Sequence, residues 1–378
     1  MNKREFLKSS VWGLEGTIRY IQKSCLVCAD LAKRRTKNWV WMTTDLKTSP
    51  DEWKRKFGEM RESGIDAILP EIYDSRFAYY ASRHLPVKVE WLEKLIPLAK
   101  AEGLEIHAWM WSMPCNIEDI YRKHHDWYVV NGKGESAADN PAYVDYYRFL
   151  CPSRLEVQDF VRTTVDELAK YPELDGIHLD YIRLPDVILA EGLQPKYGIV
   201  QDREYPQYDY CYCEACRRMF QQKTGLDPLQ LKNPSANERW RQFRYDRITE
   251  LVNLKLVPAA HKSKKIITAA VFPNWEYVRQ QWPVWQVDAV LPMLYHNYYR
   301  KDIGWIGEQT EKGVKSLSSR IPLYSGLFVP QLSSEGLAQA FDASLSGGAS
   351  GVSLFSAGAM TGEHWKSFSQ KARDVNTR

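Results

Sequence analysis

The stretch Asp175-Gly-Ile-His-Leu-Asp-Tyr-Ile-Arg-Leu-Pro185 decides the fold prediction. Its isoleucine and leucine alternate with His178 and Asp180, which predicts a short strand with one aliphatic and one polar face. The closing proline cannot donate a ladder hydrogen bond, so the strand should end before it. A carboxylate at a strand end, followed by a long loop, is typical of the catalytic end of a (β/α)8 barrel. We therefore predict a functional Asp180; the structural alternative is a carboxylate that only caps the turn or pairs with Arg183.

The chain on both sides of this stretch alternates strands with helices. Expected helices lie at 50–64, 89–102, 117–125, 153–171, 237–261, 302–317, 333–345 and 362–375. Strands are expected at 39–43, 65–69, 104–111, 266–272, 289–295, 323–328 and 351–355. Strands that are apolar on both faces indicate a parallel sheet covered by helices, and eight of them predict an α/β TIM barrel. An open doubly wound sheet would need a glycine-rich phosphate turn after an early strand, and the sequence has none.

The domain prediction is one barrel with an N-terminal extension. Residues 37–378 form the barrel, with a Cys-containing helical insertion at about 186–235 after the fourth strand. Residues 1–36 are either a degenerate export leader or an amphipathic helix, because Lys3-Arg4 resembles a twin-arginine signal while Glu15 and Arg19 interrupt the apolar region. The first alternative predicts export to the periplasm or cell envelope, and the second a cytoplasmic protein.

Composition narrows the expected partners. The 51 basic and 47 acidic residues nearly balance, with no basic stripe for nucleic acid, and no 18-residue apolar run predicts a membrane span. The sequence is rich in aromatic residues, with 14 tryptophans and 22 tyrosines, and many of them must belong to the core. A surplus beyond the needs of the core would fit a cleft in which aromatic rings stack on sugars, so the expected partner is a carbohydrate. The sequence leaves the oligomeric state open.

Carboxylates at the predicted strand ends are the candidate catalytic groups. Cleavage of a glycosidic bond needs two of them, one to protonate the leaving oxygen and one to attack the anomeric carbon or activate water. We assign Asp180 as nucleophile or base and Glu276 as acid, with Glu71 as the alternate acid. Each of the two candidate acids could instead have a purely structural role. Glu276 could be a first-turn residue that favours the helix dipole, and Glu71 could form an ion pair with an arginine of the barrel.

Residues near the same strand ends are expected to bind substrate. Aromatic rings would stack on pyranose faces, and polar groups would hold hydroxyls. Trp109 has an alternative role as barrel filler, His178 as a buried orienting residue and Asp45 as a turn residue. The predicted substrate-binding set is Asp45, His107, Trp109, Trp111, His178, Arg183, Asn274, Trp275, Tyr295 and His296.

The seven cysteines allow several interpretations. A zinc site with four cysteine ligands can be written by pairing Cys25-Leu-Val-Cys28 with Cys213-Glu-Ala-Cys216. Cys25 lies in the uncertain leader, so we favour a disulfide within the insertion or buried thiols, with Cys115 and Cys151 close together at the active end. The prediction is no metal and no cofactor.

The strand-four stretch resembles the signature of glycoside-hydrolase-like family 10. Residues 78–82 (Ala-Tyr-Tyr-Ala-Ser) and 150–157 (Leu-Cys-Pro-Ser-Arg-Leu-Glu-Val) echo the same family, and the similarity covers about residues 38 to 360. This resemblance implies a TIM barrel that acts on glycans and is commonly exported; some members cut peptidoglycan strands. The family often has a second acid directly after Asp180, where this chain has Tyr181, so only the role of Asp180 is carried over.

The sequence therefore predicts a glycoside hydrolase, retaining or inverting according to the separation of its carboxyls. A non-catalytic glycan-binding barrel is the alternative. A metal-dependent hydrolase would need a His-x-His pair or a cage of carboxylates at the strand ends, and the first strand has Trp-Val-Trp instead.

Overall fold

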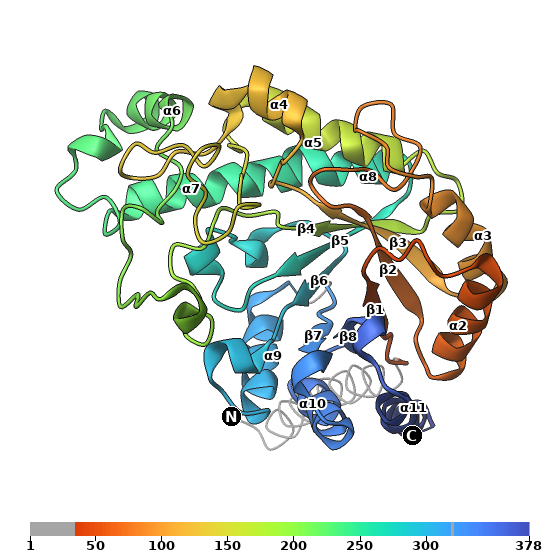
Figure 1. Cartoon of the computed structure of the whole chain (residues 1–378). Helices are drawn as coiled ribbons and strands as arrows, with labels where there is room; N and C mark the ends of the chain where they lie inside the picture. Colours follow the sequence, from red (N-terminus) through yellow and green to blue (C-terminus); the bar gives the residue numbers. More distant parts are fainter. Residues whose placement is uncertain (1–34, 319–320, 378) are drawn as a thin grey trace, which may run out of the picture.

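The computed structural model describes residues 35–318 and 321–377. These residues form a barrel of parallel strands with helices around it (Figure 1). Each strand pairs in parallel with its neighbours in the order β6-β5-β4-β3-β2-β1-β8-β7, and parallel bridges at Val290–Leu323 and Met293–Gly326 join β6 to β7. The strands are β1 (Trp39–Met42), β2 (Ala67–Tyr73), β3 (Glu105–Trp111), β4 (Gly176–Asp180), β5 (Ile266–Val271), β6 (Ala289–Pro292), β7 (Ser325–Phe328) and β8 (Val352–Phe355). The (β/α)8 prediction is confirmed.

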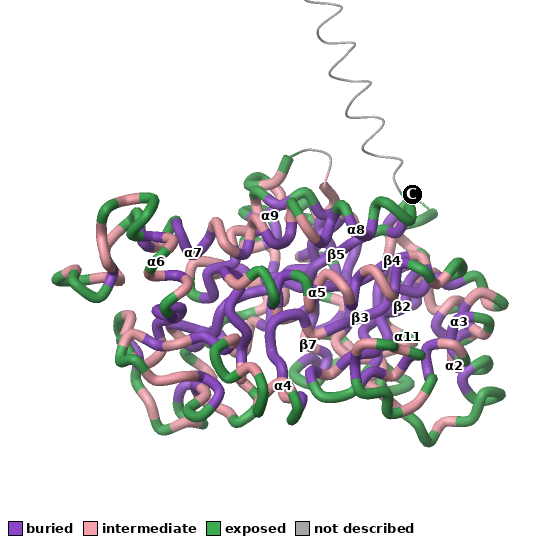
Figure 2. Tube along the Cα trace, turned by 90° about the horizontal axis from the view of Figure 1, so that it is seen from above, coloured by how far each residue is buried: buried purple, intermediate pink, exposed green. Residues whose placement is uncertain are grey.

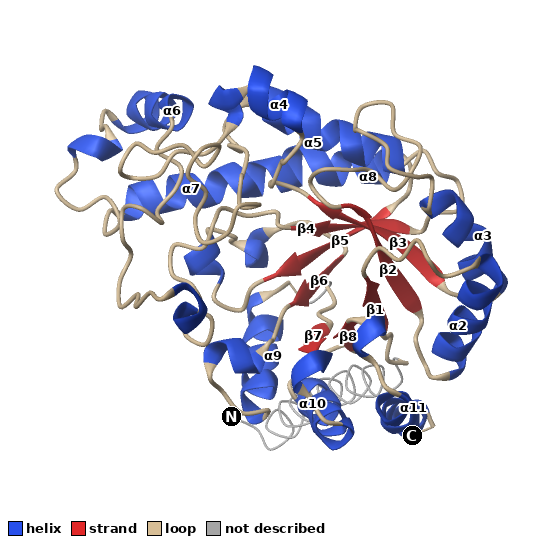
Figure 3. Cartoon of the chain, in the orientation of Figure 1, coloured by secondary structure: helices blue, strands red, loops and turns tan. Residues whose placement is uncertain are grey.

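Helices form a ring outside the strands (Figure 3). They are α2 (Pro50–Glu62), α3 (Leu92–Ala101), α4 (Glu118–Lys123), α5 (Leu155–Leu168), α6 (Glu214–Thr224), α7 (Glu238–Leu251), α8 (Val257–Lys262), α9 (Gly304–Ser316), α10 (Ser334–Ser346) and α11 (Gly362–Asn376). A π-helical segment, Val252–Leu256, joins α7 to α8 where a single helix was expected. Within the described ranges, no helix combines the length and hydropathy needed to cross a bilayer.

Strand β2 is longer than predicted. The sequence predicted an end at Leu69 with Pro70 and Glu71 at the tip, but the strand continues to Tyr73. Pro70 pairs with Met42 of β1, and the register with β3 shifts between Glu71 and Tyr73. Such an irregularity re-aims side chains at the end of a strand, so Glu71 belongs to the barrel wall and not to a loop.

Two apolar layers hold the barrel together. One lies between the strands and the helices, and Figure 2 shows the strands buried beneath more exposed outer segments. The other fills the barrel interior with large aromatic side chains, Trp39, Trp41, Trp109 and Tyr324 among them. Trp39 packs on Tyr324 with a ring-centroid distance of 5.3 Å. The interior is therefore a packed core below the carboxyl ends of the strands.

The predicted leader falls almost wholly outside the described residues, which begin at Arg35. Cys25 and Cys28, considered above as two of the four ligands of a zinc site, lie outside them as well. Thr36 is described, and its backbone N–H and hydroxyl both donate to Asn376 Oδ1 on α11.

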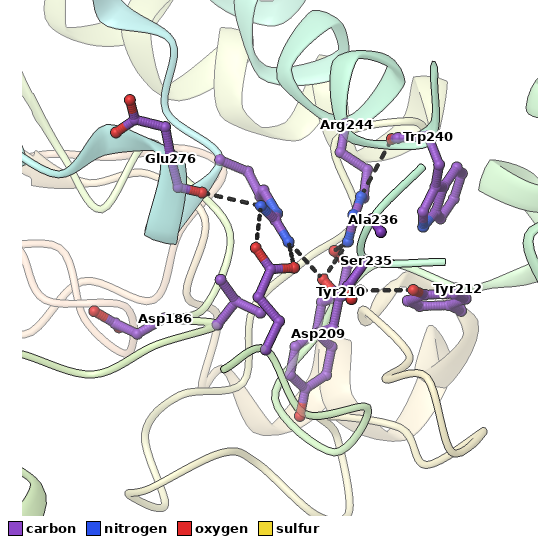
Figure 4. Close-up of polar contacts among 12 residues, drawn as sticks. Asp186, Asp209, Tyr210, Tyr212, Ser235, Ala236, Trp240, Arg244 and Glu276 are labelled. Atoms are coloured by element: carbon purple, nitrogen blue, oxygen red, sulfur yellow. Dashed lines mark hydrogen bonds and ion pairs between the residues drawn. The ribbon is translucent and has the colours of Figure 1, made fainter. Parts of the chain in front are cut away.

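A long insertion follows β4 and carries α6 (Figure 1). A buried ionic network docks it onto the barrel (Figure 4). Asp209 of the insertion pairs with Arg244 of α7 and with Arg279, whose Nη2 lies 3.0 Å from Asp209 Oδ1. Arg279 also pairs with Glu204, and the Tyr212 hydroxyl donates to Asp209 Oδ2 at 2.6 Å. The insertion is thus fixed to two neighbouring elements by charges that are buried except for the partly exposed Glu204.

Replacing Asp209 should therefore destabilise the fold strongly. Asp209→Ala leaves two buried guanidinium groups without their shared carboxylate, and breaking a buried pair in this way costs about 3–5 kcal/mol. Asp342→Ala is the control, because it breaks a more exposed pair with Lys371 and should cost less than about 1 kcal/mol. Urea unfolding of both variants measures the difference. Equal costs would contradict the docking role.

Candidate active site

A cavity of about 410 Å³ opens where the carboxyl ends of the strands meet. Glu71 of β2, Trp109 and Trp111 of β3, and Asp180 of β4 form part of its wall. Residues from the loops after β3 and β4 and from the ends of β5 to β8 complete it. These further lining residues include Tyr143, Tyr146, Tyr147, Tyr181, Arg183, Asp186, Lys196, Tyr197, Phe272, Asn274, Tyr295, Tyr298, Phe328 and Phe355.

Asp180 is the last residue of β4, and its side chain is buried in the wall of this cavity. Its Oδ2 accepts a hydrogen bond from Trp109 Nε1 at 3.0 Å, and its Oδ1 accepts one from the backbone N–H of Tyr181 at 2.6 Å. Burial raises the pKa of Asp180 to about 6, although both donors and the nearby Arg183 favour the ionised form. Tyr181 has φ of 51°, a conformation unusual for an aromatic residue, so the chain turns sharply directly after the carboxylate.

Glu71 projects from β2 into the same cavity. Its Oε1 accepts a hydrogen bond from Trp111 Nε1 at 2.9 Å, and its Oε2 accepts from the backbone N–H and the hydroxyl of Thr44. Burial raises the pKa of Glu71 to about 7, and the negative charges of Asp74 and Asp180 raise it further against those hydrogen bonds. A carboxyl group with this pKa is partly protonated near neutral pH.

Strand β3 lies between the two acids and supplies a donor to each. Glu71 pairs in register with Trp109, and Asp180 pairs with Trp111. Residues two apart on a strand share a face, so both indoles of Trp109-Met-Trp111 point into the barrel mouth. Glu71 and Asp180 are two strands apart, which places their backbones roughly 10 Å from each other. Their side chains converge on the cavity between them.

Arg183 is committed to the loop that follows Asp180. The guanidinium is buried, pairs with Asp186 at 2.9 Å and donates to the Tyr147 hydroxyl at 3.2 Å. Its carbon Cζ lies 4.7 Å from the ring centroid of Phe272. The residue therefore holds one wall of the cavity in shape while its positive charge favours ionised Asp180.

Nine of the residues that line the cavity are tyrosines, and the sequence prediction named only Tyr295 among them. Tyr143, Tyr146 and Tyr147 come from the loop between α4 and α5, and Tyr197 comes from the insertion. Tyr143 stacks on Tyr208 with ring centroids 4.8 Å apart and an interplanar angle of 5°. A cluster of three tyrosines within five residues of a polar loop was the available signal.

The structure brings together seven of the predicted site residues and separates six. Those that line the cavity are Glu71, Trp109, Trp111, Asp180, Arg183, Asn274 and Tyr295. Those that do not line it are Asp45, His107, His178, Trp275, Glu276 and His296.

The two strand histidines lie inside the barrel, below the cavity. His178 Nε2 accepts a hydrogen bond from Trp41 Nε1 at 3.1 Å, so Nδ1 carries the proton and donates to Thr268 Oγ1 at 2.8 Å. Burial lowers the pKa of His178 to about 3, which keeps the ring neutral. His107 lies on the amino-terminal side and bonds Glu105 at 3.0 Å. Both histidines support the barrel and do not reach a substrate in the cavity.

Glu276 does not share the cavity with Asp180. It lies in the 3-10 turn Trp275–Val278, and its side chain lines a separate surface depression beside Arg239 and Arg241. Arg279 Nη1 donates to the backbone carbonyl of Glu276 at 3.1 Å. Figure 4 shows the Glu276 carboxylate pointing away from that carbonyl. The sequence prediction placed Glu276 at a strand end and did not foresee this turn.

The other three predicted site residues that do not line the cavity are Asp45, Trp275 and His296. Asp45 accepts hydrogen bonds from the backbone N–H groups of Lys47 and Thr48, which makes it the turn residue named above as its alternative. Trp275 packs on Tyr245, with ring centroids 5.2 Å apart. His296 begins the 3-10 turn after β6 and is absent from the cavity lining.

No protein-family model matches this chain. A curated Bacillus subtilis (strain 168) protein described as glycosyl hydrolase YngK is 24% identical over 161 residues, which is 36% of this chain and 28% of that protein. The match thus spans little more than a quarter of the relative.

Solved structures match most of the chain at low identity. The catalytic domain of the β-amylase from Paenibacillus polymyxa has a TM-score of 0.64 at 11% identity, covering 89% of this chain and 98% of that domain. The β-galactosidase from the haloarchaeon Halorubrum lacusprofundi has a TM-score of 0.62 at 12% identity, covering 90% of this chain and 58% of that one. At these identities the likeness shows a shared barrel fold.

The raised pKa of Glu71 predicts a pH-dependent cost in stability. When the pKa of a carboxyl group is higher in the folded state than in the unfolded state, the group favours the folded state at low pH. This contribution to the free energy of unfolding is lost as the pH rises through the folded-state pKa. Glu71→Gln removes the titration, so its free energy of unfolding relative to wild type should improve by about 2 kcal/mol between about pH 5 and pH 8.

The control for this measurement is Glu105→Gln. Although burial opposes it, hydrogen bonds from His107 and Lys37 hold the pKa of Glu105 at about 2, so its own ionisation is complete throughout that pH range. Its difference from wild type should stay constant between the two pH values. A flat profile for Glu71→Gln would show that Glu71 titrates normally.

Proposed function

We propose that the protein is a glycoside hydrolase in which Glu71 and Asp180 form the catalytic pair. The observation that carries this proposal is the presence of two carboxyl groups with raised pKa values on one cavity wall, each bonded to an indole N–H from β3. Perturbed pKa values in a cleft are typical of catalytic acids and bases. The pair replaces the sequence-based pairing of Asp180 with Glu276.

The two environments assign different roles to the two acids. Glu71 has the higher pKa and acts as the general acid that protonates the leaving glycosidic oxygen. Asp180 is held in its ionised form by two N–H donors and by Arg183, so it acts as the nucleophile or as the base that activates water. This division follows the general pattern in which neighbouring groups with separated pKa values share acid and base work.

The cavity suits a sugar ring. Its volume falls within the roughly 300–1,000 Å³ of small-molecule sites. Trp111 lies in its wall with its ring centroid 4.5 Å from that of Tyr181, and Tyr146 stands beside it at 5.7 Å. Flat aromatic faces beside polar groups such as Asn274 would hold a C–H-rich pyranose face and its hydroxyls together. The substrate class we propose is therefore a poly- or oligosaccharide.

Similarity to known proteins also supports the proposal. The Bacillus subtilis relative is described as a glycosyl hydrolase, and the two similar structures are those of a β-amylase and a β-galactosidase. The resemblance to glycoside-hydrolase-like family 10 and the predicted export stay predictions of the sequence.

Substitution of the pair tests the function. Asp180→Asn and Glu71→Gln should each lower turnover of a responsive glycan by roughly 10²–10⁴-fold, because each removes one proton-transfer or nucleophilic group. Glu276→Gln is the matched control and should keep wild-type turnover, since its carboxylate lines another surface. Hydrolysis of a glycan panel, including peptidoglycan strands freed of peptides, supplies the readout.

Each outcome of that assay decides between the two functions. Loss of turnover in Asp180→Asn and in Glu71→Gln, but not in Glu276→Gln, supports the proposed pair. Loss of turnover in Glu276→Gln would favour the pair predicted from the sequence, Asp180 and Glu276. Glycan binding by wild type without turnover on any member of the panel would favour the glycan-binding barrel.

The pH dependence of the reaction should be bell-shaped and narrow. Activity needs ionised Asp180 and protonated Glu71, so kcat/KM should rise through about pH 6 and fall through about pH 7. The residual activity of Glu71→Gln should lose the alkaline limb, because no titrating acid remains. An alkaline limb that persists in this variant would assign the acid to another residue.

A further inference from the structure

Cys151 meets three closely spaced cysteines that begin 60 residues later in the sequence, and none of the four lines the cavity. Cys151 lies just before α5, and Cys211, Cys213 and Cys216 lie in the insertion at the start of α6. All four side chains are buried, and their sulfur atoms lie within 4.8 Å of one another. The sequence argument used two of them, together with two cysteines of the leader, and missed Cys151 as the partner.

The spacing of the sulfur atoms fits one tetrahedral ion. Cys151 Sγ lies 3.4 Å from the sulfur atoms of Cys213 and Cys216 and 3.7 Å from that of Cys211. Four thiolates at about 2.3 Å from a zinc ion stand about 3.8 Å apart along the edges of the tetrahedron. A disulfide bond would bring one pair to about 2.05 Å, and an iron–sulfur cluster would have to place several atoms between the four thiolates.

We propose that these four cysteines hold a structural zinc ion that fastens the insertion to the barrel. The ligand set closes the tetrahedron and leaves no position for substrate, which is the arrangement of structural sites. Metal binding displaces one proton from each thiol, so the site carries four thiolates and one Zn²⁺.

Two features beside the cluster suit anionic sulfur ligands. Cys213 is the N-cap of α6, so it lies at the positive end of that helix's dipole. The Ser153 hydroxyl lies 3.0 Å from Cys216 Sγ and donates to it once the thiol is ionised.

The ion would join two long loops whose side chains line the cavity. The loop from 124 to 154 supplies Tyr143, Tyr146 and Tyr147, and the insertion supplies Lys196 and Tyr197. Backbone contacts already link the loops: Asn131 forms an antiparallel bridge with Tyr210, and the Tyr212 N–H donates to the Val130 carbonyl at 2.7 Å. Zinc at this junction would hold the cavity-lining tyrosines of both loops in place. This structural role does not depend on whether Glu71 and Asp180 cleave glycans.

Metal analysis of the purified full chain tests the proposal. Elemental mass spectrometry should find about one zinc per chain. Cys213→Ser should lose most of this zinc, whereas Cys115→Ser, which changes a buried cysteine outside the cluster, should keep it. Amide hydrogen exchange should quicken in the two loops of the first variant and stay unchanged in β1 and β2, a response measurable without any substrate.

Three results would overturn the proposal. The first is wild-type protein that contains no zinc, and the second is zinc that stays bound in Cys213→Ser. The third is fewer free thiols than the chain has cysteines when the unfolded, unreduced protein is alkylated in the presence of chelator. The first and third concern wild type, so they decide the matter even where Cys213→Ser fails to fold. Iron in place of zinc would overturn the identity of the ion.

Discussion

The site depends on the hydrogen bonds between the two indoles of β3 and the carboxyl groups of the strands on either side. Trp109 binds Asp180 and Trp111 binds Glu71, so the buried Asp180 and the half-buried Glu71 each have a fixed donor. Burying an acid without a partner would cost several kcal/mol. With these partners the acids remain at the barrel mouth with raised pKa values, and one strand orients both of them.

That arrangement determines how the rest of the barrel is built. Large tryptophans on β1 and β3 fill the interior and leave room only above them, at the carboxyl ends. Gly176 shows how tight the interior is, because a Cβ there would overlap the ring of His107 and lie 2.5 Å from the Ile266 carbonyl oxygen. Much of the remaining cavity wall comes from the loops after β3 and β4. The Asp209 network docks the loop after β4 against α7.

Local sequence pattern predicted the fold well because each strand and helix carries its own signal. Alternation in residues 175–185 placed Asp180 at a strand end, and eight such strands predicted the barrel. The pattern failed where tertiary contacts decide. Glu276 and Glu71 both follow apolar runs, but a 3-10 turn removes the first from the cavity, and the continuation of β2 through Pro70 puts the second into it. The cavity-lining tyrosines of the two long loops and the meeting of Cys151 with the insertion depend on how these loops pack, which residue spacing does not encode.

Direct titration of Glu71 tests the central claim most closely. Carbon-13 NMR of side-chain carboxyls, with the Glu71 signal assigned by its loss in Glu71→Gln, would follow its ionisation in wild type and in Asp180→Asn. The account predicts a wild-type pKa of about 7 and a lower value in Asp180→Asn, because the charge of Asp180 is one of the causes of the shift. Titration of Glu71 near its ordinary value of 4.5, unchanged by Asp180→Asn, would contradict the proposed pair.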